Sequence, residues 1–314
     1  MMKNEMKLYR LIIAAALLSS LPALSASAQD YGRRQIDTTV RLDRGGVVDL
    51  SLISGNIRVT GWDRQDVKVS ASIESGSLRF DANSSRVSLS VDDSDDDRGR
   101  RHHNVGEARY DVSVPRGARL VLEAVSGDVR ARGSQGEVEA TSVSGDVDVI
   151  DAVRTVSVES VSGSVHAAQV NGNLRAETVS GDLRVENVTG NVEATSVSGT
   201  LRLVGIQSKD VRTETVSGDI VYSGSIDAGG KYSFESHSGT IRLNIPRGAG
   251  AQFSVETFSG DVSTDFPVTT RGSGRGREGR MEFTTGDGRA RVTAQTFSGR
   301  IVINSGLDSS TRER

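Results

Sequence analysis

The chain of 314 residues contains no cysteine. This absence excludes disulfide bonds, thiol catalysis, zinc sites built on cysteine and thiol redox chemistry, so stability must come from core burial and backbone pairing. Aromatic residues make up only 4% of the chain, whereas glycine occurs 35 times. Together with much serine, threonine and valine, this composition indicates a β-rich chain with many turns.

Long hydrophobic runs and a strong charge of one sign are also absent. No stretch after the N-terminus approaches 18 consecutive apolar residues, so no membrane-spanning segment is predicted in the mature chain. Residues 1–28 carry three basic residues and one acidic residue, so the net charge of −3 becomes −5 (−3 minus +2) without them. Such a charge favours solubility and predicts no attraction to nucleic acid or anionic lipid.

The first 28 residues have the three parts of an export signal. A short apolar run, Leu11 to Leu18, is followed by a small-residue cleavage site, Ala26-Ser27-Ala28. The basic start before the run consists of Lys3, Lys7 and Arg10. We therefore expect an exported protein whose mature chain begins near Gln29. Because no cysteine follows the apolar run, we expect no lipid anchor of the lipoprotein type.

A repeat of nine residues dominates the rest of the chain. The motif Val-Ser-Gly ends at positions spaced 18 residues apart, which are Gly127, Gly145, Gly163, Gly181 and Gly199. When each block of nine is numbered from its glycine as slot zero, slots two and four are apolar in every block of this region. Slots one and three are mostly charged or polar. Slot seven is apolar at Val143, Ala152, Val161, Val170, Val179, Val188, Val197 and Ile206, and polar only at Ser134.

Apolar slots two and four separated by a polar slot predict a strand with one buried face. The apolar slot seven is expected to join the same core. The Ser-Gly after slot seven predicts a turn, in which glycine tolerates a positive φ. A helix is excluded because a strict nine-residue repeat rich in β-branched residues leaves no period of 3.6.

Two kinds of corner alternate along the repeat, so we predict an all-β solenoid, a two-sided β-helix of 18-residue coils. Left-handed hexapeptide helices need a period of six, which is absent. An antiparallel β-meander sandwich is the alternative, since nine residues also suit a strand plus a hairpin turn. The wider glycine spacings near the C-terminus predict insertions at turns. The open ends of such a rod need protection, and the polar tail Asp308 to Arg314 is predicted to help cap one of them.

The repeated Val-Ser-Gly-Asp, the segment Ser54 to Asp63, and the paired segments Pro115-Arg116-Gly117-Ala118 and Pro246-Arg247-Gly248-Ala249 resemble a bacterial family. It is the adhesin-like β-strand repeat family, a group of unknown function, and the resemblance covers about residues 36–305. The resemblance implies an exported or envelope-associated β-solenoid. It brings no catalytic residues with it.

A charged loop, predicted at 92–108, is the strongest local anomaly. Asp93, Asp95 and Asp97 alternate as in a calcium loop. However, Arg98 stands where such loops have glycine, and further arginines follow that would repel a cation. We therefore predict a solvated loop, with a cation site as the weaker alternative.

The four histidines give weak metal signals. His102 and His103 lie in the charged loop without a third ligand specified by the sequence. His237 occupies a slot usually held by valine and is predicted to be a partly buried corner residue. His166 is predicted on the surface, stacked between Asp148 and Arg184 of neighbouring coils.

A basic loop is predicted at 271–289. Its segment Arg271 to Arg280 carries several arginines among glycines and serine. Such a loop could touch an anionic polymer. Nothing aromatic accompanies it for stacking, so a solvated loop is the better interpretation.

No catalytic constellation emerges from the sequence. Paired carboxylates for glycoside cleavage would have to be outward residues such as Glu139 and Glu193. These are better interpreted as members of a mixed charge ladder down one sheet, formed by Glu139, Ser157, Arg175, Glu193 and Arg212. A sugar-binding platform would show outward aromatic residues, whereas core positions are predicted for Tyr222, Tyr232, Phe234, Phe253 and Phe258.

The sequence therefore predicts two parts, a signal at 1–28 and a single β-repeat domain at 29–314. We expect a structural or interaction protein of the periplasm or cell surface, adhesin-like and non-enzymatic, without cofactor or metal. Its partner would be an unidentified protein or polysaccharide. The alternatives are a polysaccharide-active enzyme on a β-helix scaffold, with its site in one of the two loops, and an envelope sensory or stress-response protein.

Overall fold

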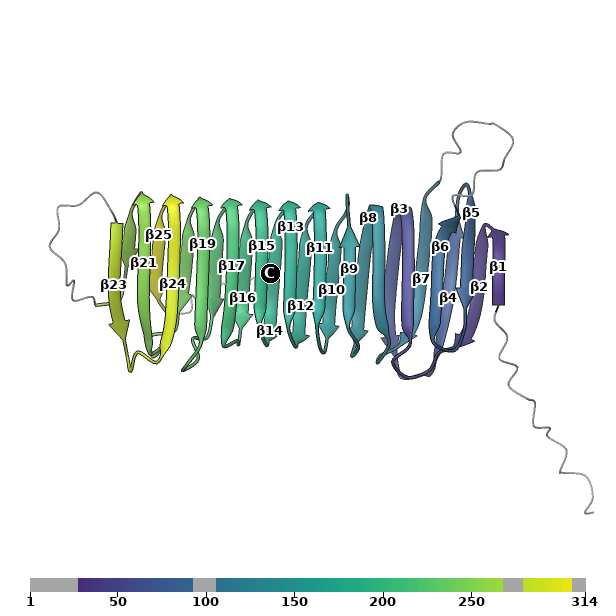
Figure 1. The fold of residues 1–314 in the computed structure, drawn as a ribbon, viewed down its shortest axis with the longest axis horizontal. Coiled ribbons are helices and arrows are strands. Elements are labelled where there is room, and N and C mark those ends of the chain that lie inside the picture. Colours follow the sequence, from purple (N-terminus) through teal and green to yellow (C-terminus); the bar gives the residue numbers. More distant parts are fainter. Residues whose placement is uncertain (1–27, 93–105, 268–278, 307–314) are drawn as a thin grey trace, which may run out of the picture.

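The computed structural model describes residues 28–92, 106–267 and 279–306. Every regular element in these ranges is a β-strand, and the strands stack along one axis into an elongated body (Figure 1). The predicted all-β solenoid is confirmed. The predicted signal cleavage region up to Ser27 and the tail Asp308 to Arg314 lie outside the described residues.

Two rows of parallel strands form the regular part of the stack. We call first sheet the row whose strands lead into Val-Ser-Gly: β9 (Val138–Ser142), β11 (Val156–Ser162), β13 (Leu174–Ser180), β15 (Val192–Ser198), β17 (Asp210–Ser217) and β19 (Lys231–Ser238). The second sheet contains β10 (Val147–Ala152), β12 (Val165–Asn171), β14 (Leu183–Thr189), β16 (Leu201–Ile206), β18 (Ile220–Gly224) and β20 (Ile241–Ile245). Within each row neighbours pair in parallel, as in Val147 opposite Val165. This parallel pairing excludes the antiparallel meander for this region.

Two long strands continue both sheets toward the N-terminal end. β8 (Arg119–Ser134) and β3 (Val47–Trp62) each run through the first sheet and then the second. They pair in parallel from Val47 opposite Arg119 to Thr60 opposite Arg132. The strands formed by the intervening described residues, 63–92 and 106–118, therefore lie beyond β3.

Antiparallel strands close the N-terminal end. Next to β3, the parallel rows continue with β6 (Arg86–Asp92) in the first sheet and β7 (Ala108–Pro115) in the second. Antiparallel partners then follow, namely β5 (Ser77–Ala82) and β1 (Ala28–Arg33) in the first row, and β4 (Asp66–Ile73) and β2 (Gln35–Arg41) in the second. The parallel stack thus gives way to antiparallel pairing, in which β5 and β4 are reversed while β1 and β2 run again in the direction of the stack. β6 and β7 border the predicted charged loop.

At the C-terminal end the order in space differs from the order in sequence. β24 (Ala290–Ser298) lies between β19 and β21 (Ala251–Ser259), and β25 (Ile301–Ser305) lies between β20 and β22 (Val262–Thr264) (Figure 1). The last described coil, formed by β24 and β25, is thus inserted between two coils that precede it in the sequence. The wide spacing before Gly299 therefore marks a change of order as well as an insertion. Residues 279–285, inside the predicted basic loop, form β23 (Gly279–Thr285), which is antiparallel to β21.

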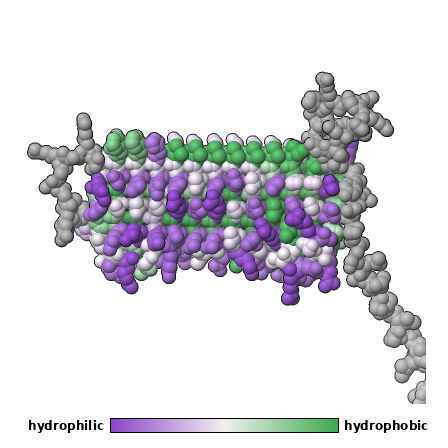
Figure 2. All heavy atoms as spheres, viewed as in Figure 1, coloured by the Kyte–Doolittle hydropathy of each residue, from purple (hydrophilic) through white to green (hydrophobic). Residues whose placement is uncertain are grey.

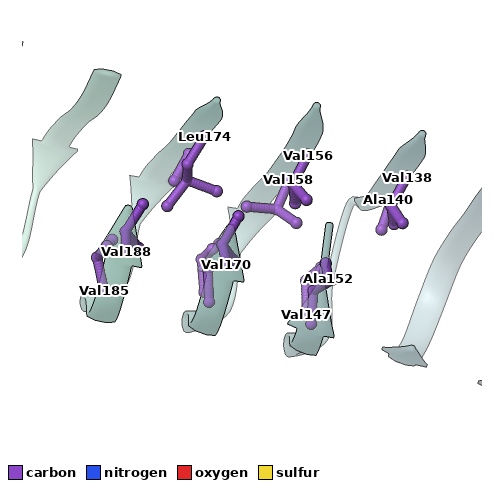
Figure 3. Packing of buried hydrophobic residues seen from close by; sticks show 14 of the residues in the cluster. Val138, Ala140, Val147, Ala152, Val156, Val158, Val170, Leu174, Val185 and Val188 are labelled. Carbon is purple, nitrogen blue, oxygen red and sulfur yellow. The ribbon is translucent and has the colours of Figure 1, made fainter. Parts of the chain in front are cut away.

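Slots two and four point inward in both sheets, as predicted. Val138, Ala140 and Val147 are buried, and Figure 3 shows such side chains meeting between the two rows of strands. The third inward position differs between the sheets. In the second sheet it is slot seven, as in Val170, whereas in the first sheet it is slot six, as in Ser160.

A left-handed residue explains this difference. In β10, β12, β14 and β16 of the second sheet the residue before slot seven has a positive φ, at Asp151 (59°), Gln169 (55°), Asn187 (53°) and Gly205 (69°). Such a residue acts as a bulge, because it shifts the alternation by one and turns slot seven inward. No described residue of the first sheet has this feature before slot seven. The prediction that slot seven is buried throughout is therefore correct for the second sheet and wrong for the first.

Candidate functional site: an exposed apolar ridge

The outward slot-seven side chains of the first sheet form one straight row along an edge of the solenoid. We call this row the ridge; in spatial order it consists of Val125, Val143, Val161, Val179, Val197, Val216, His237, Phe297 and Phe258. Nine large apolar side chains are exposed among the described residues, and all but Val153 belong to it. Figure 2 shows a row of apolar residues along one edge of the molecule, interrupted once by a hydrophilic residue.

Aromatic rings continue the valine row at the C-terminal end. The His237 and Phe297 rings stack with centroids 4.9 Å apart, and the Phe297 and Phe258 rings with centroids 4.8 Å apart. Phe297 is therefore stacked on both faces, whereas His237 and Phe258 are each stacked on one. Phe258 is 62% exposed and Phe297 50%.

The structure corrects two sequence-based expectations at this edge. His237 is exposed rather than partly buried, and Phe258 lies outside the core. The other four aromatic residues predicted in the core are buried there, namely Tyr222, Tyr232, Phe234 and Phe253. Phe297 was not predicted as a surface residue, although its position two before Gly299 is the same signal that places valine on the ridge.

Two shallow grooves run beside the ridge on the first sheet. The larger has a volume of about 590 Å³ and lies between the ridge and the outward slot-five side chains of β15, β17, β19, β21 and β24. Its walls include Glu235 and Phe297, and the slot-six residues form its floor. A smaller groove of about 360 Å³ lies at the N-terminal end, beside Val125 and Val143.

Carboxylates flank the ridge on both sides. On the first sheet the slot-five row contains Glu123, Glu159, Glu177, Glu214, Glu235 and Glu256. Beyond the turn, the slot-one row contains Asp128, Asp146, Asp182, Asp219 and Asp261. Glu177 and Glu214 form ion pairs with arginines of their own strands, whereas Glu123 and Glu159 have no ion-pair partner among the described residues. The apolar row therefore lies between two rows in which acidic residues predominate. The other positions of these rows are held by serine, threonine, glutamine and, next to Asp261, Arg300.

The slot-one aspartates also hold the coils together. The backbone N–H of Asp146 donates to Asp128 Oδ1 at 3.1 Å, that of Ser164 to Asp146 at 2.9 Å, and that of Thr200 to Asp182 at 2.9 Å. Each such aspartate satisfies an N–H of the next coil at the turn. The sequence predicted charged or polar residues in slot one but not this role.

The glycines of Val-Ser-Gly are required by the close approach of successive turns. A Cβ on Gly163 would lie 2.2 Å from the carbonyl oxygen of Gly145, and the same approach recurs from coil to coil. The predicted positive φ holds for Gly199 (131°) but not for Gly163 or Gly181. Close backbone contact, rather than φ, is thus the common reason for glycine here.

Slot-six hydroxyl groups form a second ladder beneath the ridge. Ser142 Oγ donates to the carbonyl oxygen of Gly127 at 2.9 Å, and Ser160 Oγ to that of Gly145 at 3.0 Å. Ser196 Oγ is buried and has no hydrogen-bond partner among the described residues. The bonded hydroxyl groups thus link successive turns, and the slot-seven side chains next to them point outward and take no part in this ladder.

His166 lies on the second sheet, in register between Asp148 and Arg184 as expected. Its Nδ1 is 3.0 Å from Asp148 Oδ1, and its Nε2 is 3.5 Å from Glu186 Oε2. Burial acts to raise the pKa of Glu186, but the hydrogen bonds and positive charge of Arg184, with a contribution from nearby His166, outweigh it and hold the pKa below its usual value. The described residues contain no group of three histidine, aspartate or glutamate side chains placed to hold a metal ion.

The predicted charge ladder is present, since Glu139, Ser157, Arg175, Glu193 and Arg212 occupy successive register positions. Glu139 and Glu193 are three coils apart, roughly 14 Å at ~4.8 Å per strand. That separation exceeds the span of about 5–9.5 Å used by glycoside hydrolases. Both carboxylates are instead engaged in ion pairs, Glu139 with Arg119 and Glu193 with Arg175.

The remaining candidates lie outside the described residues. These are Asp93, Asp95, Asp97, His102 and His103 of the charged loop, and residues 271–278 of the basic loop. In the part of the chain that the structure describes, no helix has the length and apolarity needed to cross a bilayer.

Comparison with known proteins identifies a matching family and two solved structures of low sequence identity. The model of the family described as Toastrack DUF4097 matches residues 112–304. A candidate adhesin from Bacteroides fragilis NCTC 9343 is 14% identical over 87% of this chain and 98% of that chain, with a TM-score of 0.40. A candidate cell adhesion protein from Clostridium sporogenes ATCC 15579 is 11% identical over 86% and 99%, with a TM-score of 0.25. The comparison with curated proteins gave no significant match.

Proposed function

The chain belongs to the Toastrack DUF4097 family, and we propose that it is an exported, adhesin-like interaction protein of the cell envelope that binds its partner through the ridge. The family membership confirms the resemblance to a bacterial repeat group of unknown function. Export is proposed from the basic, apolar and small-residue segments of the first 28 residues. Periplasm or cell surface would then be the compartment.

The ridge is the observation that carries this proposal. Its valines from Val125 to Val216 are 39–51% exposed, in six consecutive coils. Surface apolar residues normally occur singly, whereas contiguous apolar patches mark interaction sites. The fold does not require valine there, because the outward position contributes nothing to the core. A row repeated coil after coil therefore indicates a surface used for binding.

The proposed role is non-catalytic. The outward slot-three side chains of the first sheet form a ladder with paired charges, such as Arg175 with Glu193 at 2.8 Å. Ladders of this kind balance charge along a sheet instead of converging on one reacting atom. The separation of Glu139 and Glu193 supports the same interpretation.

Binding to cell envelopes tests the proposal. Purified residues 29–314 would be sedimented with envelopes of the producing bacterium, and the bound fraction measured. We expect the double variant Val161→Asn/Val179→Asn to lose binding to background, because two adjacent ridge side chains become polar. Val153→Asn is the matched control, since Val153 is a 38% exposed valine outside the ridge.

Equal binding of the wild type and the double variant would refute the ridge as the binding surface. Equal loss in the Val153→Asn control would show that binding responds to any exposed valine and would also count against the proposal. Circular dichroism of the three proteins should be the same, since each altered side chain is exposed.

A further inference from the structure

We propose that the partner presents an amphipathic helix whose apolar stripe is flanked by lysine or arginine, and that this helix docks along the ridge. The inference rests on the proposed function and names the chemistry of its partner. Three observations carry it: the length of the ridge, the acidic rows on both sides, and the spacing of the coils.

The ridge is long enough for a helix. From Val125 to Phe258 it crosses nine coils, so eight spacings of ~4.8 Å give a length of roughly 38 Å. The valine part alone, from Val125 to Val216, spans roughly 24 Å, the length of about 16 helical residues. A contact of this length buries a narrow apolar strip, which suits one helix better than a broad protein face.

The carboxylates on both sides of the ridge favour a cationic partner. Glu123 and Glu159 on one side, and Asp146 and Asp182 on the other, flank the same valine row. Basic side chains beside an apolar stripe would meet both rows, which favours association and fixes orientation. A second copy of this chain would bring acidic rows against acidic rows in a ridge-to-ridge dimer. An anionic surface would be repelled for the same reason.

Spacing distinguishes a helix from other linear ligands. Side chains on one face of a helix return every ~5.4 Å, which is close to the ~4.8 Å spacing of the coils. In an extended strand, side chains of one face return only every ~6.6–6.8 Å, which does not match. A sugar ring would stack on an aromatic face, and the valine part of the ridge, from Val125 to Val216, offers none.

The grooves provide room for the flanking side chains. A helix straddling the ridge would place one side of its stripe in the groove of about 590 Å³, whose outer wall carries Glu214, Glu235 and Glu256. At the other end the groove of about 360 Å³ lies beside Glu123. Both grooves are therefore bounded by apolar residues on the ridge side. On the other side the larger groove has three carboxylates and the smaller has one, Glu123.

Fluorescence anisotropy with a defined probe tests the inference on the full mature chain. The probe is a labelled 20-residue helical peptide with a leucine stripe flanked by lysines; the matched peptide has glutamate in place of each lysine. We expect only the lysine peptide to bind, and its affinity to fall as salt rises. Val161→Asn/Val179→Asn should weaken binding at least about tenfold, and Val153→Asn should leave it within about twofold. Glu123→Gln/Glu159→Gln should weaken it severalfold and reduce its salt dependence.

Several results would overturn the inference. These are no binding of the lysine peptide, equal binding of both peptides, unchanged affinity in the ridge variant, and a dimer in sedimentation equilibrium that the ridge variant abolishes. Ridge-dependent envelope binding without peptide binding would remove the inference and leave the proposed function intact. Loss of ridge dependence in the envelope assay would remove both.

Discussion

The two edges of each coil are built from the same nine-residue repeat, yet they treat slot seven in opposite ways. Val170 and Val188 on the second sheet are 1% and 0% exposed, whereas Val161 and Val179 on the first sheet are 39% and 46% exposed. One backbone feature separates them, the left-handed residue before slot seven. A single φ angle per coil thus decides whether a valine belongs to the core or to a binding surface.

The exposed valines of the first sheet contribute less to the free energy of unfolding than buried ones would. Burying a valine side chain contributes roughly 1.5 kcal/mol or more, and six consecutive coils leave theirs in solvent. Serine or threonine takes the inward place, and Ser160 offsets part of the loss with a hydrogen bond to the next turn. A surface kept apolar at this cost agrees with the binding role proposed for it.

The largest effect is expected from placing a charge at slot seven on the two edges. Val170→Asp should destabilise the protein by about 3–5 kcal/mol, because the carboxylate would be buried without a partner. Val179→Asp should change stability by no more than about 0.5 kcal/mol. Urea unfolding midpoints of the two variants measure the contrast, and similar midpoints would break the distinction between the edges.

The next effect concerns the glycine ladder under the ridge. Gly163→Ala should cost about 2–3 kcal/mol, because its Cβ would lie 2.2 Å from the Gly145 carbonyl oxygen. Gly117→Ala is the control, since a Cβ there meets no atom within 4 Å. Thermal melting of both variants gives the comparison. Equal melting temperatures would mean that the coils can separate at this edge without loss.

The bulge itself can be changed at Gln169, whose φ is 55°. Gln169→Val should destabilise by about 1–2 kcal/mol, because a β-branched residue is strained in the left-handed region. Gln169→Gly should stabilise by up to about 1 kcal/mol for the opposite reason. Chemical unfolding of the pair would show whether the left-handed residue sets the buried edge; a reversed order would argue against it.

The smallest effect is expected in the hydroxyl row. Ser160→Ala should cost about 1 kcal/mol, since it removes the hydrogen bond to Gly145, 3.0 Å long. Ser196→Ala should be neutral or slightly stabilising, because that buried hydroxyl group has no partner among the described residues. Differential scanning calorimetry can resolve the two, and an equal loss would show that both hydroxyl groups are bonded.

Much of the regular region could be predicted from the sequence. A period of two inside a period of nine placed Val138 and Ala140 in the core, and the 18-residue recurrence of Val-Ser-Gly gave the parallel stacking. The same spacing predicted the ladder from Glu139 to Arg212. These features follow from local alternation and constant repeat length, which are visible in one dimension.

The burial of slot seven and the order of the strands at the two ends could not be predicted from the local pattern. Whether slot seven is buried depends on the backbone at Asp151, Gln169 and Asn187, and the apolar pattern is the same with or without the bulge. The aromatic end of the ridge was missed for this reason, because Phe258 fits a slot that is buried on the other edge. The antiparallel strands at the N-terminal end and the place of β24 between β19 and β21 depend on long-range pairing, which the local pattern does not encode.

Thiol reactivity tests the central contrast between the edges most directly, since the chain has no cysteine of its own. Val179→Cys and Val170→Cys would be reacted separately with a chromogenic disulfide reagent under native conditions. The account predicts that the ridge cysteine reacts within about tenfold of the rate in the unfolded chain, and that the core cysteine reacts at least about a thousandfold more slowly. Equal reactivity of the two cysteines would contradict it.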